Sequence, residues 1–286
     1  MQTFAFALLA AALYGTALVT THCGLRHMPA LAGARISVPS AALLFWLLSP
    51  FFLDAAGWQL QAVVLFALVG LFYPAAVTLL TFVSNRRLGP TVAGTIGSTT
   101  PLFAVLGAAL FLGEAPGVRE LAATAVIVLG TMALSKPVVG GTPEAARNAL
   151  WMPWSAALLR ALAQVLSKAG LALWSSPFAA VLIGYSVSAA IVWSAGRLAP
   201  GNRAAEFNRH GAAWFALTGI VNGAAVLSMY HALTTGPVQV VAPVVATYPL
   251  FTLALSALLL RHERLDARMI GGVALTVAGV VILLAR

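Results

Sequence analysis

The sequence predicts an all-α integral membrane protein whose ten transmembrane helices form a 5+5 inverted repeat. Three observations support this fold class. Hydrophobic residues make up 61% of the 286 residues and charged residues only 8%, whereas about a quarter of a soluble domain is charged. The acidic residues fall at or near breaks between apolar stretches. One sequence block also occurs twice, about half a chain apart.

The repeated block begins with Gly-Pro, continues with Pro-Leu-Phe and ends with a Glu that closes an apolar run. Its copies cover residues 89–114 and 236–263. Each copy closes a half that holds five apolar spans. Because five is odd, the second half must lie upside down relative to the first if every span crosses the bilayer. Inverted repeats of this kind are common among membrane transporters.

The ten spans, read in order from the breaks, each come close to the ~20 residues that a helix needs to cross the hydrocarbon core. Helices are predicted because lipid cannot satisfy free backbone N–H and C=O groups, and no alternating barrel pattern is present. We interpret the first span as a mature helix rather than a signal peptide, since Met1, Gln2 and Thr3 carry no basic charge. The expected spans are 4–21, 33–51, 62–83, 91–112, 117–135, 152–173, 178–197, 211–233, 238–260 and 267–285.

The domain organisation follows from these spans: a first five-helix repeat over 1–136, a linker over 137–149 and a second repeat over 150–286. Lys and Arg are distributed unequally between the two sides of the predicted membrane domain. Three fall on the side that holds both termini and eleven on the other, with Arg35 and Arg160 inside spans. The positive-inside rule therefore places both termini outside the cytoplasm.

Composition also excludes several classes of function. The net charge of +9 comes from basic residues in short loops between spans, so anionic headgroups, and not nucleic acid, are the expected counter-charge. Cys23 is the single cysteine, which excludes an intramolecular disulfide and a cysteine-based metal cluster. No phosphate-binding glycine loop and no metal-binding His-Glu-x-x-His motif is present, so we expect neither cofactor nor metal.

The ordered motifs resemble the EamA family of the drug/metabolite transporter superfamily. The second half carries the resemblance through Tyr230 to Leu233, Gly236 to Pro243, Pro249 to Phe251 and Leu260 to Glu263. The first half matches more loosely through Arg35, Gly70, Gly89-Pro90, Pro101 to Phe103 and Leu112 to Glu114. The resemblance implies alternating access through a central cavity lined by the first four helices of each half, often for export of amino acids or related metabolites.

The sequence departs from the family pattern in two places. Arg261-His262 replaces the usual Leu-Gly before the second Glu, and the second loop lacks the basic residues that members with cytoplasmic termini usually carry. The family resemblance favours both termini inside the cell, whereas the Lys/Arg count favours both outside. The sequence leaves these two orientations open.

Candidate substrate-binding residues are polar groups inside the spans, because such groups are costly in hydrocarbon. Arg160, Gln164 and Lys168 recur every four residues and share one helical face, which suits a cavity wall that attracts a carboxylate or phosphate. The alternative is that Arg160 pairs with a backbone carbonyl or loop acid, while snorkelling to the interface is the preferred interpretation for Lys168 and Arg35. The complete predicted set is Tyr14, Arg35, Tyr73, Thr99, Arg160, Gln164, Asn222, Tyr230 and Tyr248.

Pro101 and Pro249 occupy matching positions in the two halves and are predicted to bend their helices, shaping the cavity and its gates. Glu114 and Glu263 are predicted to cap the helix that follows each or to pair with a nearby Arg. No Asp or Glu lies deep in a span. That arrangement favours facilitated diffusion or exchange over strict proton antiport.

The sequence predicts a multi-pass protein of the inner cell membrane that transports a small anionic or zwitterionic metabolite, such as an amino acid or organic acid, and is not an enzyme. The expected partners are this small molecule and the lipid bilayer, without nucleic acid; a homodimer is compatible with the architecture. Two alternatives are an exporter of drug-like compounds and an integral membrane enzyme acting on lipid. The second would use His262-Glu263, which is flanked by Arg261 and Arg264.

Overall fold

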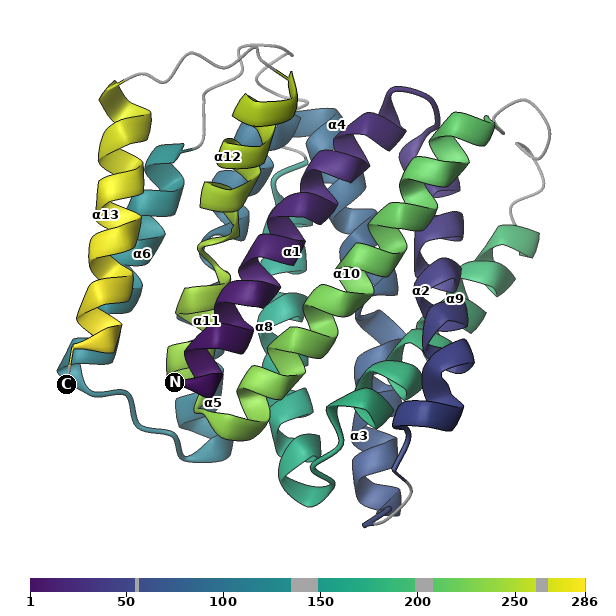
Figure 1. Cartoon of the computed structure of the whole chain (residues 1–286), viewed down its shortest axis with the longest axis horizontal. Coiled ribbons are helices and arrows are strands. Elements are labelled where there is room, and N and C mark those ends of the chain that lie inside the picture. The colour runs from purple at the N-terminus through teal and green to yellow at the C-terminus, as the bar shows by residue number, and fades with distance from the viewer. Residues whose placement is uncertain (55–56, 135–148, 199–207, 261–266, 286) are drawn as a thin grey trace.

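Apolar helices build the part of the chain that the computed structural model describes, which comprises residues 1–54, 57–134, 149–198, 208–260 and 267–285 (Figure 1). The helices are α1 (Gln2–Leu25), α2 (Ala30–Phe52), α3 (Leu60–Phe72), α4 (Ala75–Gly97), α5 (Thr100–Leu112), α6 (Val118–Leu134), α8 (Trp151–Leu173), α9 (Pro177–Leu198), α10 (Arg209–Thr235), α11 (Val238–Val245), α12 (Tyr248–Leu260) and α13 (Ala267–Leu284).

Eight helical stretches of the described chain are long and apolar enough to cross a membrane. The shorter apolar helix α5 and the 17-residue α6 complete the ten predicted spans. The all-helical ten-span prediction is therefore confirmed. Both termini lie at the same end of the bundle (Figure 1), as an even number of spans requires.

Several spans are broken rather than continuous, and side-chain hydroxyls satisfy the backbone groups that the breaks leave free. Between α3 and α4, Ser188 of α9 donates to the Gly70 carbonyl at 2.6 Å and accepts from the Ala75 N–H at 3.3 Å. In the fourth span Thr99 donates to the Ile96 carbonyl at 2.6 Å. These bonds matter because an unsatisfied backbone group in hydrocarbon is costly.

Pro101 and Pro249 each lie in the first turn of the helix that follows a break, α5 and α12 respectively. Thr247 donates to the Val244 carbonyl at 2.7 Å, the counterpart of the Thr99 bond in the other repeat. The break in each repeat thus has the same local construction. A helix can start at such a proline because the first-turn N–H that proline lacks has no intrahelical acceptor.

The two Gly-Pro pairs of the repeated block differ in backbone structure. Gly236 ends α10 and Pro237 precedes the first residue of α11, as the repeated block predicts. Gly89-Pro90 instead lies within α4, which continues to Gly97. The expected break between residues 83 and 91 is therefore helical, since a helix can continue through a proline when it forgoes one backbone hydrogen bond.

The two repeats pack mainly against each other. Helix α1 packs against α10 and α12, and its counterpart α8 packs against α3, α4 and α5. Gly15 allows a close approach of α1 to α12, because a Cβ there would lie 2.9 Å from both the Thr252 nitrogen and the Tyr248 oxygen. Small residues at helix interfaces are typical of membrane bundles.

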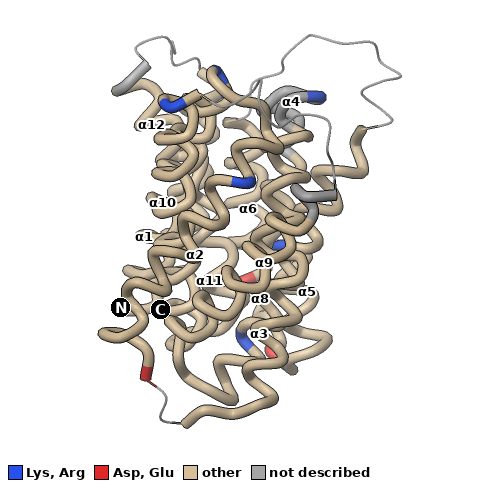
Figure 2. The backbone as a smooth tube through the Cα atoms, turned by 90° about the vertical axis from the view of Figure 1, so that its right-hand side faces the viewer, with Lys and Arg blue, Asp and Glu red and all other residues tan. Residues whose placement is uncertain are grey.

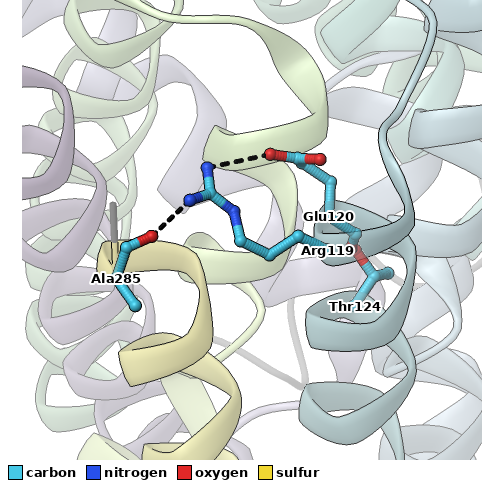
Figure 3. A network of polar contacts seen from close by, with 4 residues as sticks. All are labelled: Arg119, Glu120, Thr124 and Ala285. Atoms are coloured by element: carbon cyan, nitrogen blue, oxygen red, sulfur yellow. Dashed lines mark hydrogen bonds and ion pairs between the residues drawn. The ribbon is translucent and has the colours of Figure 1, made fainter.

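The fifth and tenth spans, α6 and α13, pack chiefly on each other at the edge of the bundle (Figure 1). At the end of this pair Arg119 donates to the carbonyl of Ala285 and forms an ion pair with Glu120 at 3.1 Å (Figure 3). Charged residues lie mostly near the two ends of the bundle, with few between them (Figure 2). This distribution is the one that a hydrocarbon layer around the middle of the bundle requires.

Candidate functional site

A cavity of about 890 Å³ lies between the two repeats. It begins at Tyr14, midway along α1, and extends past the end of that helix to Arg26 and Pro29. Because α1 starts at the end of the bundle that carries the termini (Figure 1), the cavity extends toward the opposite end. Its volume is near the upper limit for small-molecule sites, about 300–1,000 Å³.

Hydrogen-bonded tyrosines form the inner end of the cavity. The hydroxyls of Tyr14 and Tyr73 lie 2.8 Å apart. Asn222 donates through Nδ2 to the Tyr185 hydroxyl at 3.0 Å. The polar tips therefore pair near the middle of the membrane while the rings present apolar faces, which suits a ligand with both kinds of surface.

Arg160 supplies a positive charge to the cavity wall. Its Nη2 donates to Thr81 Oγ1 at 3.3 Å, so α8 and α4 are joined across the wall. A Cβ on Gly97 would lie 3.5 Å from the Tyr248 hydroxyl and 3.9 Å from Arg160 Nη1. Tyr248 and Arg160 thus converge on Gly97, a position of α4 that has no side chain.

Gln164 lies one helical turn beyond Arg160 and is only 3% exposed. It lines the cavity, yet its Oε1 accepts no hydrogen bond from any described residue. Ser84 Oγ, which also lines the cavity, is fully buried and likewise has no partner within the described part of the chain. Buried polar groups are nearly always hydrogen-bonded, so these two atoms mark places where a ligand or water would supply a partner.

Six of the nine predicted site residues line this cavity: Tyr14, Tyr73, Arg160, Gln164, Asn222 and Tyr248. The other three lie elsewhere. Arg35 of α2 is outside the lining, the Thr99 hydroxyl is engaged at the helix break, and Tyr230 accepts a hydrogen bond from Ser167 at 2.8 Å in a buried position. Six of the predicted residues therefore lie around one cavity.

Sequence reasoning missed several lining residues, of which Tyr185 is the most informative. It lies in the middle of α9 and is 2% exposed, so the mid-span tyrosine criterion that selected Tyr14 would also have selected it. Thr81 and Ser84 gave no such signal, because Thr and Ser are common in transmembrane helices and usually bond their own backbone.

The end of the bundle near the termini is closed by contacts between the repeats. The Phe6 and His231 rings stack with centroids 5.0 Å apart, and the Thr3 and Thr235 hydroxyls lie 3.0 Å apart. Glu114 Oε2 accepts the Val238 N–H at 2.7 Å. Glu114 thus caps a helix of the other repeat rather than the helix that follows it, and Arg119 pairs with Glu120 instead.

Comparison with known proteins agrees with this two-repeat architecture. The EamA-like transporter family matches residues 2–136 and again residues 148–285. The chain belongs to the EamA-like transporter family. It is therefore a multi-pass membrane protein of a transporter family, which is consistent with a non-enzymatic role. The pair His262-Glu263, considered for a lipid-modifying enzyme, lies outside the described residues.

A solved crystal structure whose description names no function has the same fold. Its TM-score is 0.76 at 15% sequence identity, and the match covers 98% of this chain and 94% of that one. At this identity the likeness establishes the fold alone. No curated protein matches the chain.

Proposed function

We propose that this EamA-like protein exports a small anionic or zwitterionic metabolite, such as an amino acid or an organic acid, by alternating access through the central cavity. The observation that carries the proposal is the position of Arg160 in the cavity wall. Arg26 adds a second cation at the mouth, and no Asp or Glu is among the described lining residues. A cavity of this charge attracts anions and repels organic cations.

Gln164 indicates that the substrate carries a hydrogen-bond donor in addition to its anionic group. Its unpaired Oε1 needs an N–H or O–H donor, and side chains one turn apart on a helix have Cβ atoms about 5–6 Å apart. A molecule with a carboxylate near Arg160 and an ammonium or hydroxyl near Gln164 satisfies both residues. The apolar faces of the tyrosines suit the remainder of such a molecule.

The direction of transport follows from combining the open mouth with the charge distribution. The cavity opens away from the termini, toward the side on which the sequence places eleven of the Lys and Arg residues. If this basic side faces the cytoplasm, as the positive-inside rule indicates, the cavity would load a cytoplasmic solute. Closure of the mouth and opening of the opposite end would then release it outside.

The test is flux of radiolabelled solutes in proteoliposomes that contain the purified protein. We expect amino acids or hydroxy acids to move, and Arg160→Ala to lower the apparent affinity at least tenfold, because removing one partner of a buried charge pair costs about 2–5 kcal/mol. Arg160→Lys keeps the charge and is the matched control. Gln164→Leu should lower the apparent affinity for substrates that carry a donor group more than the apparent affinity for simple carboxylates. Preferential movement of quaternary ammonium compounds would instead support the drug-exporter alternative.

A further inference from the structure

The two repeats supply equivalent gate helices, and within the described part of the chain one pair of them is clearly packed together. In the first repeat α5 follows the break before Pro101, and in the second repeat α12 follows the equivalent break before Pro249. At the end near the termini, α5 packs against α11 of the other repeat. Among the described residues, α12 makes no comparable contact with α4 at the opposite end. The cavity mouth lies at that unpacked end.

Glu114 joins the packed pair. Gly113 ends α5 with φ +68°, a left-handed conformation that favours glycine. The Glu114 N–H then bonds the Ala108 carbonyl at 3.2 Å, which fixes the direction in which its side chain leaves the helix. The carboxylate reaches Val238, the first residue of α11, and accepts its N–H at 2.7 Å.

Among the described residues of the second repeat, no side chain caps the N-terminus of α11. Its N-cap residue is Pro237, which makes no side-chain cap hydrogen bond. A helix N-terminus carries partial positive charge and free N–H donors, so a carboxylate is its preferred partner. Charge-assisted hydrogen bonds of this length are about twice as strong as neutral ones. The stabilising group therefore comes from the opposite repeat.

Lys168 of α8 contacts the turn between α10 and α11 on the α10 side. Its Nζ donates to the carbonyls of Leu233 and Gly236, at 2.6 and 2.9 Å, where α10 ends. At the turn between α10 and α11, the Lys168 ammonium therefore contacts carbonyls at the end of α10, and the Glu114 carboxylate contacts the first N–H of α11. Lys168 belongs to the same repeat as this turn, whereas Glu114 does not. Of these two contacts, the one made by Glu114 must break when the repeats separate, whereas the one made by Lys168 can persist.

We propose that the Glu114–Val238 hydrogen bond is the latch that keeps the terminal-side end of the transport path closed, so that Glu114 is a positioning residue for the transport cycle. The inference rests on the alternating-access part of the proposed function. For that end to open, α5 must leave α11, which removes the carboxylate from the α11 N-terminus. The mouth closes in the same step as α12 packs against α4, the arrangement that the repeat symmetry provides.

The test uses two single-cysteine reporters in a Cys23→Ser background, labelled with a maleimide in detergent. Val241→Cys places a thiol at a fully buried position of α11 beside the latch. Ser256→Cys places one in the open mouth. We expect Glu114→Gln, which replaces a charged hydrogen bond by a neutral one, to raise the labelling rate at position 241 up to about tenfold, and to slow labelling at position 256.

Faster labelling at position 241 together with slower labelling at position 256 distinguishes release of the latch from damage to the fold, because partial unfolding would speed labelling at both positions. Glu120→Gln removes a carboxylate at the same end of the bundle and should change neither rate. Unchanged rates in the Glu114→Gln protein, or a rise at both positions, would overturn the proposal. Reciprocal labelling without flux of any anionic solute would leave the latch standing and contradict the substrate proposal instead.

Discussion

Replacing Gly130 by Ala should weaken the contact between α6 and α13. A Cβ at Gly130 would lie 2.6 Å from the Thr276 nitrogen and 2.9 Å from the Gly272 oxygen. Both are backbone atoms, so the helices must move apart by about 0.8 Å, from 2.6 to the 3.4 Å of an ordinary contact. Overpacking of this kind costs about 1–3 kcal/mol.

Gly271→Ala is the matched control, because a Cβ at Gly271 has nothing within 4 Å. Both substitutions gain the same helix propensity, about 1 kcal/mol. The difference in melting temperature between the two variants therefore reports only the cost of the close contact at Gly130. At roughly 2 °C per kcal/mol for a chain of this size, Gly130→Ala should melt about 2–6 °C below Gly271→Ala. The assay is thermal unfolding of the purified proteins in one detergent. Equal melting temperatures would refute the reasoning.

Four further predictions concern buried hydrogen bonds, the cavity and the orientation in the membrane. Lys168→Met should lower the melting temperature by several degrees, because it leaves two carbonyls without a donor at about 1–3 kcal/mol each. Tyr230→Phe and Ser167→Ala break one shared hydrogen bond, so in a double-mutant cycle their effects on stability should be less than additive. Gly97→Ala meets only ordinary contacts; it should fold normally and reduce flux of bulky substrates before small ones. A C-terminal alkaline phosphatase fusion should be active, and a C-terminal green fluorescent protein fusion dark, if the basic side is cytoplasmic.

Hydropathy and repetition predicted most of this fold. The expected spans correspond to the observed helices except around residues 83–91, where α4 continues, because each span needs only an apolar stretch, a property of local sequence. The repeated block also predicted the equivalence of Pro101 and Pro249. The helical continuation through Gly89-Pro90 was not predictable, since the same dipeptide ends a helix in the second repeat.

The candidate site was predictable only in part, because helical spacing shows which face a residue shares but not what lies opposite. Arg160 and Gln164 share a face and both reach the cavity, whereas Lys168 on that same face bonds backbone carbonyls at the closed end. The partner of Glu114 lies 124 positions away in the other repeat. Such a contact depends on how the repeats pack, which no local pattern records.

The packing of the two repeats has a consequence for fragment complementation. Helix α1 lies against α10, and α6 lies against α13, so each half of the chain covers apolar surface of the other. A polypeptide ending at Leu134 would carry those faces uncovered, and so would one starting at Ala149. Co-expressed, the two fragments should assemble into a working heterodimer, while either fragment alone should be degraded. The covalent connection between the halves then serves mainly to keep their amounts equal.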